Sequence, residues 1–219
     1  MVANMQANER QQEQQVRVSD PALSHPRELS LAEQERRSTH KWRIIAYTLA
    51  LIVVASAPYG FGRSLAMNQT DRILSITSHI TAQGMALLGW SITVIMLLIL
   101  AMAVLESRHV LWRILFLLAL AAEQFIGGIA LLRLNFWTAT FVIYGKESLG
   151  VNALNMGIIA AGAALAVFAV VYVGMLVLIK KDSKINILTR SWSAMTLFFL
   201  IEILALLVAI FGGLPMLMQ

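Results

Sequence analysis

The 219-residue sequence contains no cysteine, and only 13% of its residues are charged. Without cysteine, the chain cannot form disulfide bonds, carry out thiolate chemistry or bind metal and iron-sulfur groups through sulfur. Soluble proteins carry charge on about a quarter of their residues, whereas 58% of this chain is hydrophobic and its mean hydropathy is +0.73. The composition therefore predicts an integral membrane protein.

Histidine is also scarce, with four in the chain. His25 and His40 fall in the polar N-terminal region, while His79 and His109 flank opposite ends of one apolar run, so no two can face each other across a membrane-buried haem. The His-Glu-x-x-His, Gly-x-Ser-x-Gly and P-loop patterns do not occur. We therefore expect no enzyme, no metal site and no cofactor, although we expect bound lipid, and a single pigment contact stays open.

What the chain does contain is a series of long apolar runs. About 20 helical residues cross the ~30 Å hydrocarbon layer of a bilayer. Pro58, Tyr59 and Gly60 are the expected end of the first run, and the aromatic-rich connection at residues 135–152 is expected to lie at the membrane interface. The predicted fold is an all-α bundle of five transmembrane helices within residues 41–219, with spans at about residues 42–59, 82–105, 110–134, 153–179 and 192–215.

Residues 1–40 are polar throughout and rich in Gln, Glu and Arg. We expect them to form a cytoplasmic tail that is disordered or contains a short surface helix. Basic residues gather before the first run, between the second and third, and between the fourth and fifth. This bias favours an N terminus in the cytoplasm and a C terminus outside, and we expect a bacterial cytoplasmic membrane.

Glu123 and Glu202 are the only acids deep within the apolar runs. Each lies about ten residues, or about 15 Å, from the cytoplasmic end of its run, on a helix face rich in small residues that is expected to point into the bundle. Ionisation there would cost several kcal/mol, so we expect neutral acids unless water or a cation reaches them. Together with Gln124 they could handle protons or cations, or form interhelical hydrogen bonds worth about 0.5 to 2 kcal/mol. We favour the hydrogen bonds, because no further acid or histidine continues a relay along either run.

Small residues recur in the fourth run, where small-xxx-small spacing allows helix backbones to approach closely. This run is therefore predicted to be the central packing helix, through Gly157, Ala160, Ala161 and Ala164. Arg113 and Arg133 flank the third run. We expect them to reach opposite head-group layers, and lipid-phosphate binding is their functional alternative.

These features favour a non-catalytic integral membrane subunit that packs against and stabilises a larger membrane protein complex. The chain is small, has an odd number of spans without internal repeats, and offers little polar lining. Its expected partners are membrane lipid and other membrane subunits or copies of itself, with no nucleic acid, because its basic residues adjoin apolar runs. The alternative is a small proton- or cation-coupled carrier, or an oligomeric channel, that uses Glu123 and Glu202. An intramembrane enzyme would need a catalytic constellation that the sequence lacks.

Overall fold

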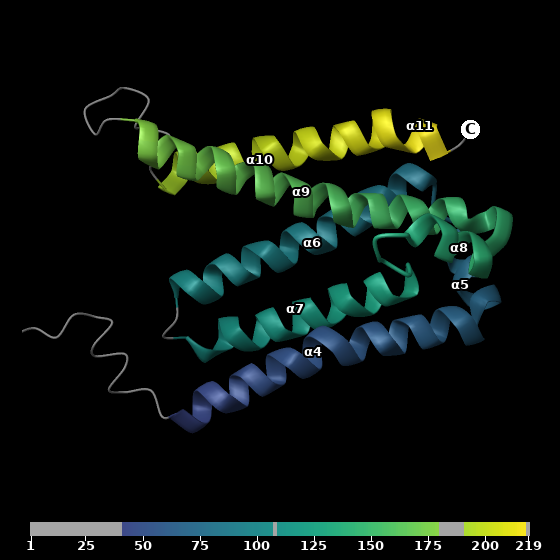
Figure 1. The fold of residues 1–219 in the computed structure, drawn as a ribbon, viewed down its shortest axis with the longest axis horizontal. Coiled ribbons are helices and arrows are strands. Elements are labelled where there is room, and N and C mark those ends of the chain that lie inside the picture. Colours follow the sequence, from purple (N-terminus) through teal and green to yellow (C-terminus); the bar gives the residue numbers. More distant parts are fainter. Residues whose placement is uncertain (1–40, 107–108, 180–190, 218–219) are drawn as a thin grey trace, which may run out of the picture. The chain divides into compact units, whose positions relative to one another are not determined.

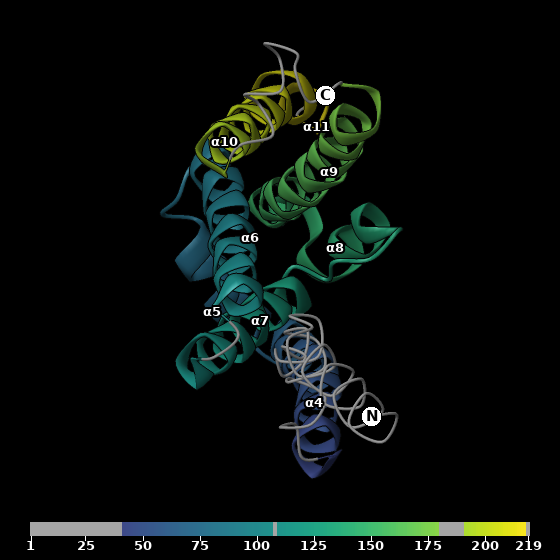
Figure 2. The same cartoon turned by 90° about the vertical axis from the view of Figure 1, so that its left-hand side faces the viewer.

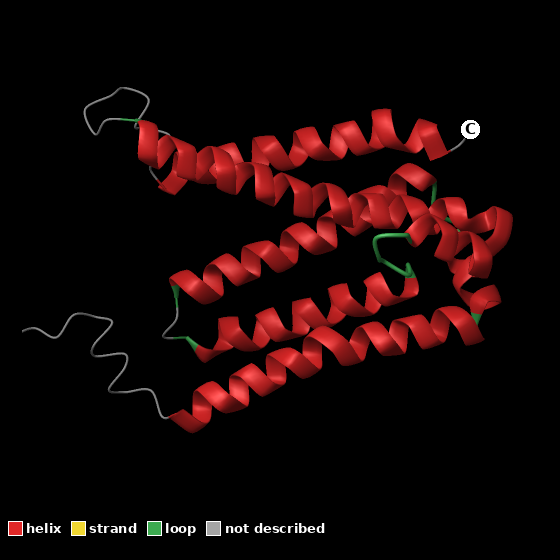
Figure 3. Ribbon diagram, in the orientation of Figure 1, coloured by secondary structure: helices red, strands yellow, loops and turns green. Residues whose placement is uncertain are grey.

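The structure is a computed structural model that describes residues 41–106, 109–179 and 191–217, so the predictions for residues 1–40 lie outside it. The chain divides into two units, residues 1–48 and 49–219. In the first unit the described residues, 41–48, form the beginning of one helix. Across the described ranges the structure is helical and contains no strand (Figure 3).

The order of elements along the chain can be followed in Figure 1. They are α4 (Lys41–Asn68), α5 (Thr70–Thr77), α6 (Ala82–Leu105), α7 (Val110–Ile129), α8 (Phe136–Tyr144), η1 (Gly145–Glu147), α9 (Ser148–Leu178), α10 (Ser191–Val208), η3 (Ala209–Gly213) and α11 (Leu214–Leu217). Five helical segments are long and apolar enough to cross a membrane. The predicted all-helical class and the five long apolar helices are therefore confirmed.

The first apolar helix is longer than its sequence pattern suggested. We expected it to end at Pro58, Tyr59 and Gly60, but α4 continues through Pro58 to Asn68. A proline removes one backbone hydrogen bond from a helix, which apolar helices tolerate when their neighbours support the backbone. Here the support lies just beyond the proline, where Gly62 packs directly against the backbone of α7 at Phe125 and Gly128.

The third apolar helix is shorter than expected, and the segment after it is more ordered. We predicted a span to residue 134, but α7 ends at Ile129 because Leu131 has a φ of 54°. A left-handed residue of this kind closes a helix C terminus, and the Leu132 amide then donates to the Gly127 carbonyl over 2.8 Å. The expected interfacial connection at residues 135–152 is mostly helical, consisting of α8, η1 and the first turn of α9.

The last apolar segment changes its winding before it ends. Residues Ala209–Gly213 form a π-helix in which the Leu214 amide donates to the Ala209 carbonyl, five residues earlier. Pro215 has no amide hydrogen with which to continue the α-helical ladder, and a π turn at this place changes the register before the proline. The π segment contacts α9, where Gly213 lies against the Met156 side chain.

Within residues 49–219, α6 and α9 form the most extensive helix-to-helix contact. Figure 1 shows α6 between α7 and α9, and Figure 2 shows α10 next to both α6 and α9. The α6–α9 crossing is close because glycine lies on both sides of it. Gly157 faces the Ala86 carbonyl, and Gly89 faces the Leu154 carbonyl. We predicted the fourth run, now α9, as the central packing helix. In the structure α6 has a similar place, because it contacts three helices, α7, α9 and α10.

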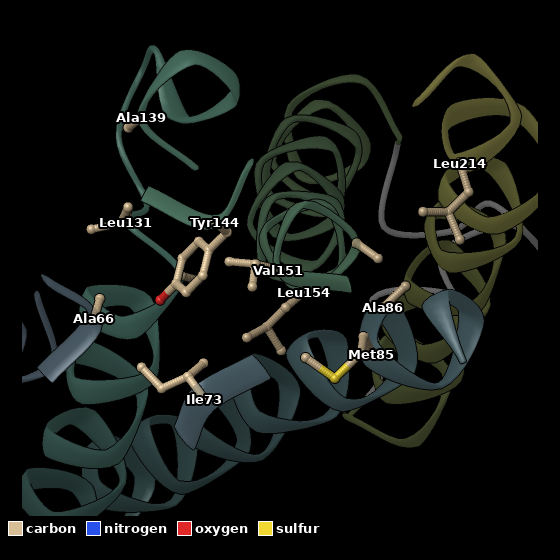
Figure 4. Packing of buried hydrophobic residues seen from close by; sticks show 12 residues of the cluster. Ala66, Ile73, Met85, Ala86, Leu131, Ala139, Tyr144, Val151, Leu154 and Leu214 are labelled. Atoms are coloured by element: carbon tan, nitrogen blue, oxygen red, sulfur yellow. The ribbon is translucent and has the colours of Figure 1, made fainter. Parts of the chain in front are cut away.

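A hydrophobic cluster joins the ends of these helices near α5 and α8 (Figure 4). Tyr144, on α8, lies between Leu131 and Val151 in this cluster, and the residue is 4% exposed. Ala66 and Met85 bring α4 and α6 into the same cluster. The cluster therefore holds together the end of the bundle where α4 ends and α9 begins.

Candidate functional site

The most deeply buried charged residue of the described segments is Glu202, on α10, which is 0% exposed. Its Oε2 atom accepts a hydrogen bond of 3.0 Å from Nε1 of Trp90 on α6. Its other oxygen, Oε1, is buried and has no hydrogen-bond partner in the described structure. An indole N–H can only donate, so a proton carried by this carboxyl group would reside on Oε1.

Trp90 is held in place by the packing around it. It lies against a small apolar cluster of Val94, Ala161 and Phe198, which come from α6, α9 and α10. Phe198 makes an edge-to-face contact with Phe168, with ring centroids 5.4 Å apart. Residues of three helices therefore hold the indole ring in place. This packing limits the positions that the indole N–H can adopt beside Glu202.

Glu123, on α7, also accepts a hydrogen bond from a residue of α6. Thr93 of α6 donates from Oγ1 to Oε1 of Glu123 over 2.9 Å. Thr93 is 4% exposed and Glu123 is 8% exposed. This hydrogen bond therefore joins α6 to α7 inside the molecule, as the bond from Trp90 joins α6 to α10.

The two donors lie within one turn of α6. Trp90 and Thr93 are three residues apart, which corresponds to about 4.5 Å along a helix axis. Glu123 and Glu202, which are remote in sequence, thus meet α6 at similar heights. The structure brings each acid to its own donor, and it records no hydrogen bond between the two acids. We call Trp90, Thr93, Glu123 and Glu202 the α6 joint.

The remaining predicted residues fall in different places. Gln124 is half-buried, and its side chain has no hydrogen bond within the described segments. The small residues of α9 are buried, and Gly157 touches α6 next to Trp90: Gly157, Ala160, Ala161 and Ala164. Arg113 is half-buried in the first turn of α7, whereas Arg133 is exposed in the loop beyond its last turn. The length of α7 therefore separates the two arginines.

A second polar cluster surrounds the C terminus of α7. The last carbonyl groups of a helix have no partner within the helix. Here Tyr144 donates to the Ile129 carbonyl over 2.7 Å, and Asn155 donates from Nδ2 to the Ala130 carbonyl over 2.6 Å. Tyr59 donates to the Leu132 carbonyl over 3.1 Å. Side chains of α8, α9 and α4 thus each satisfy one carbonyl, and the end of α7 becomes the point where these helices meet.

Neither polar cluster has the composition of a metal centre. The described part of the chain contains no group of three or more His, Asp or Glu side chains that could hold an ion. No family model matches this chain. Neither a curated protein nor a solved structure matches it.

The sequence identified the two acids but not their donors. Trp90 and Thr93 lie in an apolar run where a tryptophan and a threonine are unremarkable, and their spacing of three residues was the only signal that they share a face. Asn152 and Asn155 have the same spacing at the start of α9. Asn152 accepts from Thr140 of α8 over 2.6 Å, so both asparagines join α9 to a neighbouring element.

Proposed function

We propose that this protein is a non-catalytic, five-span membrane subunit that packs laterally against a larger membrane protein complex and stabilises it. The observation that carries the proposal is the α6 joint. The two acids deep in the spans each accept one hydrogen bond from a neighbouring helix. Acids used in this way fix the positions of α7 and α10 on α6, which is a structural role for polar groups in an apolar bundle.

The surface of α4 supports the same proposal. None of the residues in its most apolar stretch is buried. In a membrane, helices associate through close packing rather than through the hydrophobic effect, and the close backbone contact of α4 with α7 lies around Gly62, beyond the middle of α4. Its exposed side chains, among them Leu49, Ile52 and Val53, can contact either lipid or another subunit. We propose that part of this surface contacts another subunit.

The proposed orientation places the N terminus in the cytoplasm of a bacterial cell and the C terminus outside. The charge bias between the two ends of the spans supports it. In this orientation Arg113 lies near the cytoplasmic head groups and Arg133 near the outer ones. A cysteine introduced at residue 72, beyond the end of α4, should react with an impermeant maleimide in intact cells, whereas a cysteine at residue 106 should react only after lysis.

Extraction in a mild detergent followed by mass analysis tests the subunit proposal. We expect a protein partner in fixed stoichiometry. A photo-reactive amino acid at Ile52, on α4, should form a cross-link to that same partner, and one at Ala161, which is buried between helices, should not. A monodisperse protein that cross-links only to lipid from Ile52 would contradict the proposal.

One observation favours a second function, a proton- or cation-coupled carrier. Oε1 of Glu202 is a buried carboxyl oxygen that has no hydrogen-bond partner among the described residues, and such an atom could bind and release a proton. Protein reconstituted in liposomes should then carry a proton or cation flux that Glu202→Gln and Glu123→Gln abolish, while Glu106→Gln, in the loop after α6, leaves it intact. Liposomes without flux, or flux unchanged by both substitutions in the spans, would exclude the carrier.

A further inference from the structure

A cavity of about 150 Å³ opens where α4, the loop after α7 and α8 come together. Arg63 and Met67 line it from α4, Arg133 lines it from the loop, and Val142 lines it from α8. Arg63 and Arg133, which are 70 residues apart in sequence, thus face one space. Arginine stays protonated in proteins, and the lining contains no acidic residue. The cavity therefore carries two positive charges without a negative one.

The two arginines are attached to a firmly held frame. Gly128 lies against the backbone of α4 at Tyr59 and Arg63, so the helix that carries Arg63 cannot move away from α7 without losing this contact. Tyr59 also lines the cavity, and its hydroxyl donates to the Leu132 carbonyl, the residue next to Arg133. The Leu132 carbonyl is thus bonded to a neutral donor, and within the described residues neither guanidinium group has a hydrogen bond or ion pair that would keep it from a ligand.

Apart from the hydroxyl groups of Tyr59 and Thr138, the rest of the lining is apolar, and part of it is open to the surroundings of the helices. Met67 is 49% exposed and Val142 is 73% exposed. Arg63 lies five residues before the end of the apolar helix α4, which corresponds to about 7.5 Å of helix. A cavity at this height, lined by two arginines and by mostly apolar side chains, matches a molecule that has both a phosphate group and an acyl chain.

We propose that this cavity binds an anionic phospholipid. Arg63 and Arg133 contact the phosphate group, because planar guanidinium groups form charge-assisted hydrogen bonds with phosphate oxygens. Met67 and Val142 contact the first part of the acyl chain. The sequence had singled out Arg133 as a lipid contact, and the structure adds Arg63, the cavity and the acyl-chain wall. The site is independent of whether the protein is a subunit or a carrier.

Native mass spectrometry of the detergent-solubilised full chain tests the site, with phosphatidylglycerol as the probe and phosphatidylcholine and inorganic phosphate as comparisons. A basic side chain near an anionic lipid strengthens binding about five- to sixfold, so two together contribute about thirtyfold. We expect the double variant Arg63→Gln, Arg133→Gln to lose about thirtyfold in phosphatidylglycerol affinity. Arg72→Gln is the matched control, because Arg72 is an exposed arginine on α5 that does not line the cavity.

Several results would overturn the proposal. Equal phosphatidylglycerol affinity of the double variant and the unmodified protein would show that neither arginine contributes to lipid binding. An equal loss in Arg72→Gln would mean that net charge, and not the cavity, attracts the lipid. Inorganic phosphate that competes as well as the lipid would mean that the ligand is a free anion. Arg63→Lys, Arg133→Lys, which keeps the charge, guards against misfolding and should retain more affinity than the glutamine variant.

Discussion

The close contact of α6 and α9 at Gly157 predicts a large effect from a single methyl group. A Cβ atom built on Gly157 would meet the Ala86 carbonyl oxygen and would lie 2.8 Å from the amide nitrogen of Trp90. Both are backbone atoms, so no change of side-chain rotamer can relieve the overlap. Gly157→Ala must therefore move α6 and α9 apart at the helix turn that carries Trp90.

The magnitude follows from comparison with a second glycine of the same helix. A Cβ on Gly162 would meet no atom within 4 Å. Replacement of glycine by alanine favours a helix by about 1 kcal/mol at either position, whereas overpacking costs about 1 to 3 kcal/mol at Gly157 alone. Gly157→Ala should therefore be about 1 to 3 kcal/mol less stable than Gly162→Ala.

Thermal unfolding in detergent, followed by far-ultraviolet circular dichroism, measures this difference. At about 2 to 4 °C per kcal/mol for a chain of this size, the Tm of Gly157→Ala should lie about 2 to 12 °C below that of Gly162→Ala. Equal Tm values for the two variants would refute the close backbone contact between α6 and α9.

Three further substitutions test other contacts by the same unfolding measurement. Gly62→Ala should be about 1 to 3 kcal/mol less stable than Gly60→Ala, since a methyl group at Gly62 would meet the backbone of α7, whereas one at Gly60 meets no atom within 4 Å; equal stability of the two variants would mean that α4 does not touch α7 there. Tyr144→Phe should cost about 1 to 3 kcal/mol, because the Ile129 carbonyl would lose its donor, and an unchanged Tm would count against this cap. Thr140→Val removes the buried bond to Asn152 and should cost a similar amount, whereas full stability would show that α8 and α9 do not depend on it.

The five apolar helices could be predicted because their length and hydropathy are properties of continuous sequence. Their ends could not be predicted as well. Pro58 and Gly60 are strong signals for a turn, but the contact between Gly62 and α7 comes from a segment more than 60 residues later and keeps α4 helical. The end of α7 depends on the left-handed conformation of Leu131. A leucine in a sequence gives no sign that it will adopt this conformation.

The candidate site was predictable only in part, for a related reason. Glu123 and Glu202 stand out as acids within apolar runs, and that feature is local. Their donors, Trp90 and Thr93, become recognisable only when α6 is placed between α7 and α10. Arg63 likewise gains significance only because folding brings it to the same cavity as Arg133. Pairings between helices that are distant in sequence are not encoded in any single run.

The central claim is that the buried acids hold helices together through donors on α6, and a double-mutant cycle on Trp90 and Glu202 tests it most directly. The variants are Trp90→Phe, Glu202→Leu and the double substitution, each unfolded in the same detergent. We predict a coupling energy of about 0.5 to 2 kcal/mol, as measured for hydrogen bonds between membrane helices. Strict additivity of the two substitutions would contradict the account, because two side chains that do not interact cannot join α6 to α10.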